Sequence, residues 1–242
     1  MFGRVAVGGF TRAVASSPSP TVPLDFATAH MGNDLNEFPP PDGGYCTKVV
    51  PSTGPTFTSA LAIAAGATDA PTYNTGSGIH TLGASAALTS ATTVTIPAGQ
   101  DCLIYVKANL GVTPRLYPLG LSSSADVRVG VAGDGDATVD LSVGATLSVS
   151  LYYDTHSAGV YLYRFRRSGS SWYIARTGDA EQSATVTGTA TAAISFDTLL
   201  GYRNGSGLDV FSASGDYLQK LKISYGSASP DTAYELANGG LL

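Results

Sequence analysis

Charged side chains are scarce in this sequence: Asp, Glu, Lys and Arg make up only 13% of its 242 residues, against about 25% in an average soluble protein. The formal net charge is -5, and there is no long cluster of Lys or Arg, so nucleic-acid binding is not expected. No run of about 18 apolar residues is present, so no membrane-spanning helix is expected either. The two cysteines, Cys46 and Cys102, lie far apart, which favours free buried thiols over a disulfide.

Residues typical of catalysis are also few. Glycanases that hydrolyse glycosidic bonds on a jelly roll need two carboxylates that face each other across a cleft, but the three glutamates lie singly along the chain. The three histidines are scattered too, and there is no nucleophile elbow, phosphate loop or zinc motif. We therefore expect no enzymatic activity and no cofactor.

The chain does show the period-2 alternation of β-strands from about residue 59 onward. With 29 Gly and 13 Pro and almost no helical periodicity, this pattern predicts an all-β fold, an antiparallel β-sandwich. A short C-terminal helix is predicted in SASPDTAYELANGG, where Ser229 can cap, Pro230 fits the first turn and Asp231 favours the positive helix end. The expected strands include Thr92 to Ile96, Cys102 to Ala108, Val127 to Val131, Thr138 to Val143, Thr146 to Tyr153 and Leu221 to Tyr225.

The stretch GVYLYRFRRSGSSWYIARTG, residues 159–178, is the densest aromatic and basic run and predicts a hairpin closed by a Ser/Gly turn. It allows two interpretations. In one, Trp172 stacks on a sugar ring while Arg164 and Asp154 contact hydroxyls or acidic groups. In the other, the aromatic side chains form the face of the sheet that packs on the core. The arginines then lie on the solvent-exposed face or at the rim of a subunit interface.

Residues 1–58 lack sustained alternation and contain proline clusters, which predicts an extended N-terminal arm before a sandwich domain at residues 59–242. The arm is too apolar for a solvated linker, so we expect it to lie on its own domain or on a neighbouring subunit. Its candidate anchors are Phe2, Phe10, Phe26 and Phe38.

The segment AGDGDATVD, residues 132–140, places Asp134 and Asp136 around Gly135. Carboxylates at this spacing could surround a hard cation such as calcium, although the later bidentate Glu of a known calcium loop is missing. Asp-Gly is also a hairpin signal, so the alternative is an ordinary turn between strands.

The C-terminal part of the chain resembles the concanavalin A-like jelly roll in its laminin G-like form. The resemblance rests on LSVSLYYDTHSAGVYLYRFRRSG and on AISFDTLLGYRNGSGLDVFSASGDYLQKLKISYGSASPDTAYELANGG. It implies a concanavalin-like sandwich whose strand-end loop, LLGYRNGSGLDVF, lies near the ligand-binding rim. Tyr202, Arg203 and Asn204 are therefore candidate glycan contacts, while Asn204-Gly205 alone predicts a tight turn.

In overall style the chain is also similar to tailed-phage virion proteins such as head decorations, fibres and tail spikes. An apolar arm and a weakly charged surface suit proteins that pack against copies of themselves. We therefore expect a non-catalytic virion structural protein that forms homo-oligomers or binds other virion proteins. The alternative is a lectin-like module that binds glycans. A third hypothesis, that the protein is a glycan-cleaving enzyme, is supported by fold analogy alone.

Overall fold

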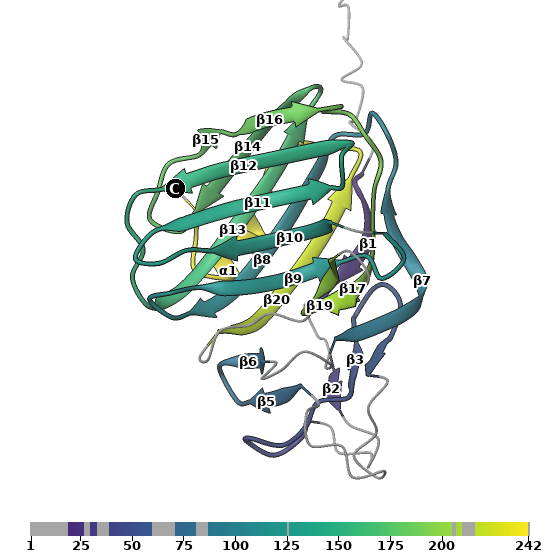
Figure 1. Ribbon diagram of the computed structural model, residues 1–242, viewed down its shortest axis with the longest axis vertical. Coiled ribbons are helices and arrows are strands. Elements are labelled where there is room, and N and C mark those ends of the chain that lie inside the picture. Colours follow the sequence, from purple (N-terminus) through teal and green to yellow (C-terminus); the bar gives the residue numbers. More distant parts are fainter. Residues whose placement is uncertain are drawn as a thin grey trace, which may run out of the picture.

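The computed structural model describes residues 19–26, 30–32, 39–59, 71–80, 87–124, 126–204, 207–209 and 216–241. In this part of the chain two large antiparallel sheets pack face to face (Figure 1). The eight-stranded sheet has the order β15 (Gln182–Ser183), β14 (Ser171–Arg176), β13 (Gly159–Ser168), β8 (Cys102–Leu110), β20 (Tyr217–Tyr225), β6 (Gly78–His80) and β5 (Thr72–Asn74), and β1 (Thr21–Asp25) also pairs with β20.

The ten-stranded sheet forms the other layer. Its order is β16 (Thr185–Gly188), β12 (Leu147–Tyr153), β11 (Ala137–Val143), β10 (Val127–Ala132), β9 (Arg115–Gly120), β17 (Ile194–Leu199), β7 (Leu88–Ile96), β4 (Phe57–Ser59), β3 (Lys48–Val50) and β2 (His30–Gly32). A separate two-stranded ladder joins β18 (Tyr202–Asn204) to β19 (Gly207–Asp209), and one helix, α1, spans Thr232–Ala237. The predicted all-β class, an antiparallel sandwich of the jelly-roll type with a short C-terminal helix, is confirmed.

The core lies between the sheets because alternate residues of each strand face inward. In β8, Cys102, Ile104 and Val106 are buried there against the partner sheet. Leu103 and Tyr105 point to the opposite face, where they pack with Tyr234 of α1. Both cysteines are free and buried, as predicted, and burial raises the pKa of the Cys102 thiol to about 11.

The aromatic and basic hairpin is β13–β14, with Ser168 paired to Ser171. Its inward face carries Tyr163 and Phe165, both fully buried. Arg167 is buried as well, and its guanidinium donates to the carbonyl oxygens of Gln100, Ala192 and Pro97 at 2.6, 2.7 and 3.1 Å. The structural interpretation of this hairpin therefore accounts for its inward side chains.

The predicted arm, where described, belongs to the sandwich. β1 pairs with β20, and β3 and β4 extend the ten-stranded sheet. Phe26 is fully buried in the core, so this candidate anchor packs on its own domain. A boundary at residue 58 would cut through β4. Phe2, Phe10 and Phe38 lie outside the described residues.

The C-terminal helix begins after Asp231 rather than after Ser229. The Asp231 side chain accepts a hydrogen bond from the backbone N–H of Tyr234 at 3.0 Å, and its carboxylate also meets Lys222 Nζ at 2.7 Å. A carboxylate at this position favours the positive end of the helix. Among the described residues, no helix has the length and apolar character needed to cross a membrane.

Candidate functional site: a pocket beside the β5–β6 hairpin

A pocket of about 240 Å³ lies where two segments meet along one edge of β20. β1 occupies one end of this edge, where Asp25 pairs with Lys222, and β6 occupies the other, where Ile79 pairs with Leu218. The pocket opens between them. It is lined by Met31, Tyr73, Asn74, Gly76, Gly78, Lys107, Gln219 and Lys220.

A β-bulge in β20 supplies two of the lining side chains. Leu218 pairs with Ala108 and Lys220 with Lys107, so Gln219 is the extra residue on the bulged strand. Successive side chains of a regular strand point to opposite faces. The bulge re-aims one of them, which explains why both Gln219 and Lys220 line the same pocket.

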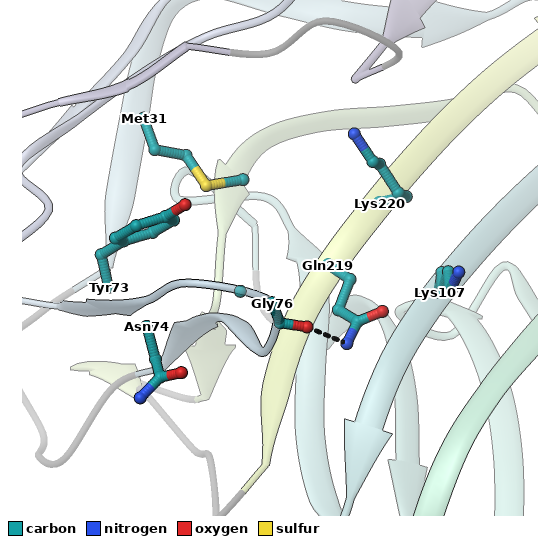
Figure 2. Close-up of a pocket in the computed structure, with 8 residues that line it drawn as sticks. Met31, Tyr73, Asn74, Gly76, Lys107, Gln219 and Lys220 are labelled. Atoms are coloured by element: carbon teal, nitrogen blue, oxygen red, sulfur yellow. Dashed lines mark hydrogen bonds between the residues drawn. The ribbon is translucent and has the colours of Figure 1, made fainter. Parts of the chain in front are cut away.

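The β5–β6 hairpin is held tightly against this bulge. Gly78 adopts φ +108°, and a Cβ atom at this position would lie 2.1 Å from the backbone oxygen of Leu218. Any side chain would therefore push the hairpin away. At its tip, the Gln219 side-chain amide donates to the Gly76 carbonyl at 3.0 Å (Figure 2).

Tyr73 is fixed by its backbone on the outer side of this hairpin. Its N–H donates to the Gly44 carbonyl at 2.8 Å, and its carbonyl accepts from the Gly43 N–H at the same distance. The neighbouring turn is anchored by Asp42, which accepts from the Thr75 N–H at 2.6 Å; this bond lowers the pKa of the Asp42 carboxyl. The backbone that carries the Tyr73 side chain is therefore held in place by hydrogen bonds on both sides.

Figure 2 shows Met31 and Tyr73 next to each other on one side of the pocket. Gln219 and Lys220 approach from β20 on the other side, and Lys107 follows on the neighbouring strand. Lys220 Nζ donates to the Phe26 carbonyl at 3.2 Å. Within the described residues, Tyr73 Oη and Lys107 Nζ have no hydrogen-bond partner, so both remain available to a ligand.

The residues predicted to contact glycans are distributed over separate regions. Trp172 and Arg164 belong to the eight-stranded sheet, whereas Tyr202, Arg203 and Asn204 belong to β18 in the short ladder. Asp154 is exposed just after β12. None of them lines the β5–β6 pocket.

Two of these predictions require correction. Trp172 is only 1% exposed, and its indole N–H donates to the Ala190 carbonyl at 2.9 Å, so the ring offers no face for stacking on a sugar. Arg164 is buried and forms ion pairs with Glu181 and Glu235. Its charge is therefore neutralised inside the molecule, because a buried charge requires a partner.

Tyr202, in contrast, lies in a compact cluster near the ten-stranded sheet. Its ring is 4.8 Å from that of Tyr117, and the Arg128 guanidinium lies 5.0 Å from its centroid. Arg128 also binds Asp140 at 3.1 Å; burial raises the pKa of this carboxyl. Arg203 donates to the Ser122 carbonyl at 3.3 Å, and the Asn204 backbone pairs with Gly207.

The acidic segment between β10 and β11 forms a turn. Asp136 accepts hydrogen bonds from the Asp134 N–H at 3.0 Å and from the Tyr152 hydroxyl at 2.7 Å, and these bonds lower the pKa of its carboxyl. Gly135 has φ +76°, as a turn requires. Within the described residues, no group of three or more His, Cys, Asp or Glu side chains is arranged to hold a metal ion.

Comparison with known proteins yields neither a matching family model nor a matching curated protein sequence. Solved structures give distant similarities only. A phage module, the "CBM2 module of Lactobacillus casei BL23 phage J-1 evolved Dit", is 11% identical over 60% of this chain and 71% of its own, with a TM-score of 0.36. Domains LG4-5 of the mouse laminin alpha1 chain are 13% identical over 74% of this chain and 50% of theirs, with a TM-score of 0.38.

The third similarity corrects the prediction about catalysis. An alginate lyase from Corynebacterium sp. is 13% identical over 84% of this chain and 96% of its own, with a TM-score of 0.35, and two further alginate lyases also match. Enzymes thus occur among the β-sandwiches that this chain resembles. The expectation that the chain is not an enzyme was wrong, because it treated missing carboxylate pairs as evidence against every kind of catalysis. These likenesses do not assign an activity to this chain.

Proposed function

We propose that the protein is a carbohydrate-binding β-sandwich that holds one sugar unit in the β5–β6 pocket. The observation that carries the proposal is the combination of a fixed aromatic ring, Tyr73, with the amide and ammonium groups of Gln219 and Lys107 around one cavity. Aromatic rings pack on the C–H face of a sugar, while amides and ammonium groups bond to its polar substituents.

The size of the pocket suits a single unit of a glycan chain. At about 240 Å³ it is smaller than typical pockets for whole drug-sized ligands, which span about 300–1,000 Å³. The rest of a longer glycan would lie outside, along the surface beyond the hairpin. We therefore expect recognition of a terminal or side-branch sugar.

Calorimetric titration of the full chain with a panel of soluble neutral and acidic oligosaccharides tests this proposal. Tyr73→Ala should weaken binding by at least about tenfold, or about 1.4 kcal/mol. The control is Tyr152→Ala, because Tyr152 is an exposed tyrosine on β12 that does not line this pocket. If no glycan binds, the proposal is wrong. If Tyr202→Ala abolishes binding and Tyr73→Ala does not, the site lies at the short ladder instead.

The second candidate function is that of a structural protein in a virus particle. It is favoured by the low charge of the chain, which suits packing against other copies. In this proposal the protein belongs to an extracellular phage particle. It assembles with itself or with other virion proteins.

The native mass of the full chain beside a version that begins at residue 19 tests the assembly role. This truncation keeps β1, β3 and β4, which a version beginning at residue 59 would lose or cut. A defined oligomer that disappears on truncation would support assembly through the first 18 residues. If both versions are monomers and neither binds purified phage particles, the virion role is contradicted.

A further inference from the structure

Among the described residues that line the pocket, the charged side chains have one sign. Two of these residues are lysines, Lys107 and Lys220, and none carries a carboxylate. The chain as a whole has a net charge of -5, so this local excess of positive charge runs against the overall composition. A pocket with this lining attracts anions rather than cations.

Lys107 differs from the other cations on the same face of the eight-stranded sheet. Lys222 is bound by Asp231 at 2.7 Å, and Arg164 and Arg166 are bound by Glu181. Lys107 Nζ has no hydrogen bond or ion pair to any described residue. Its ammonium group therefore lacks the internal partner that its neighbours have.

The strand register places the two pocket lysines opposite each other. Lys107 and Lys220 are direct cross-strand partners in the β8–β20 pair. Like charges placed opposite each other on neighbouring strands destabilise a sheet. An anion bound beside Lys107 would relieve this repulsion, so the arrangement favours a negatively charged ligand.

Resting on the carbohydrate-binding role proposed above, we infer that the sugar held in this pocket is acidic and that its anionic substituent contacts Lys107. The sugar ring then packs on Tyr73, and the negative group, a carboxylate or a sulfate ester, lies between β8 and the hairpin. An ammonium group binds either anion as a point charge. Binding of this kind weakens as salt concentration rises.

Titration with oligogalacturonate and with its neutral methyl ester tests this inference, because the two share the same ring. A sulfated galactose oligosaccharide and its unsulfated form make the second pair. The wild-type chain should bind the charged member of at least one pair about tenfold more tightly. Whichever pair shows the preference identifies the anion as carboxylate or sulfate.

Lys107→Met should bring the affinities for the charged and the neutral member together, because the ammonium group that distinguishes them is gone. Lys107→Arg should retain the preference. Circular dichroism of each variant verifies that the fold is intact. If the neutral members bind as tightly as the charged ones, or if Lys107→Met keeps the preference, the inference is overturned while the carbohydrate-binding role stands. Failure to bind any member contradicts both.

Discussion

The outer face of the eight-stranded sheet has two halves that differ in how their positively charged side chains are paired. On the half covered by α1, Arg164 and Arg166 bind Glu181, and Arg164 also binds Glu235. On the other half, two residues along β8 from Tyr105, Lys107 has no such partner in the described part of the chain. The basic residues most conspicuous in the sequence are thus structural. The functional candidate is a single lysine in an ordinary alternating strand.

The covered half is a connected network that fixes the helix. Tyr105 donates to Glu235 at 2.8 Å, and the Asp231 N–H donates to the Tyr105 hydroxyl at 2.8 Å. These hydrogen bonds tie α1 to the sheet, and the ring of Tyr234 packs against that of Tyr105 at 5.0 Å. Charge in this half is paired within the molecule, whereas the Lys107 charge has no ion-pair partner among the described residues.

The largest effect is expected from Arg164→Met. The substitution leaves Glu235 buried beside Tyr105 without its guanidinium, and losing one partner of a buried ion pair typically costs about 3–5 kcal/mol. Urea denaturation should show this loss of unfolding free energy. Arg164→Met combined with Glu235→Gln should recover part of it, which a purely steric effect would not. A loss under about 1 kcal/mol would mean that the network is not structural.

Gly78→Ala should have an intermediate effect that falls on the pocket half. A side chain at φ +108° would meet the Leu218 carbonyl, and a residue held in such a conformation costs about 1–3 kcal/mol. We expect this loss in urea denaturation, together with loss of glycan binding. Gly76→Ala is the matched control for the clash, because Gly76 shares the positive φ, +83°, but its Cβ would meet no atom within 4 Å. Intact glycan binding in Gly78→Ala would contradict the tight placement of the hairpin.

Features of the fold that depend on residues close together in the sequence could be predicted, whereas features that depend on tertiary contacts could not. Alternation within a strand is local, so the faces of β8, β12, β13 and β20 were predictable, as was the existence of the terminal helix. The helix cap was misassigned to Ser229, because two neighbouring residues, Ser229 and Asp231, both favour that role. Asp231, the actual cap, also binds Lys222 of β20, and this tertiary contact could not be predicted from the local sequence.

The pocket could not be predicted by the same reasoning. Lys107 lies in a strand that the sequence predicts, but its pairing with Lys220 depends on the register between two strands far apart in the chain. The bulge at Gln219 breaks the period-2 rule that the sequence reading used. Arg164 and Trp172 were candidates for glycan contact because aromatic and basic residues also bind ligands. Only the tertiary structure shows that they are buried.

Acid should weaken the covered half selectively. Burial raises the pKa of Glu181, but hydrogen bonds from Arg166 and Arg164 outweigh it and hold the pKa below its ordinary value. The unfolded chain therefore takes up a proton first as the pH falls. The stabilisation is fully present above the ordinary glutamate pKa of about 4.3 and is lost as the pH falls through the lower folded value.

The stability difference between the wild-type chain and Glu181→Gln measures this contribution. It should be constant near neutral pH and shrink as the pH falls below about 4, as followed by urea denaturation at each pH. A difference that stays the same down to the acid limit would show that Glu181 is not held by the two arginines in solution.

The smallest effect on stability is expected from Lys107→Met. Removing a half-buried cation that pairs with no described residue should change the unfolding free energy by less than about 0.5 kcal/mol. Relief of repulsion from Lys220 should make the change stabilising in low salt. Urea denaturation of this variant beside Arg164→Met sharpens the contrast between the two halves. A loss as large as that of Arg164→Met would mean that Lys107 also has a structural role.

The most direct test of the central claim is to map the bound glycan on the full chain by NMR chemical-shift changes. The account predicts that saturating acidic oligosaccharide shifts the backbone signals of Tyr73, Gly76, Lys107 and Gln219. Signals of Tyr202 and Arg203 should stay in place. Shifts confined to the short ladder, or no shifts with any glycan of the panel, would contradict the proposed site.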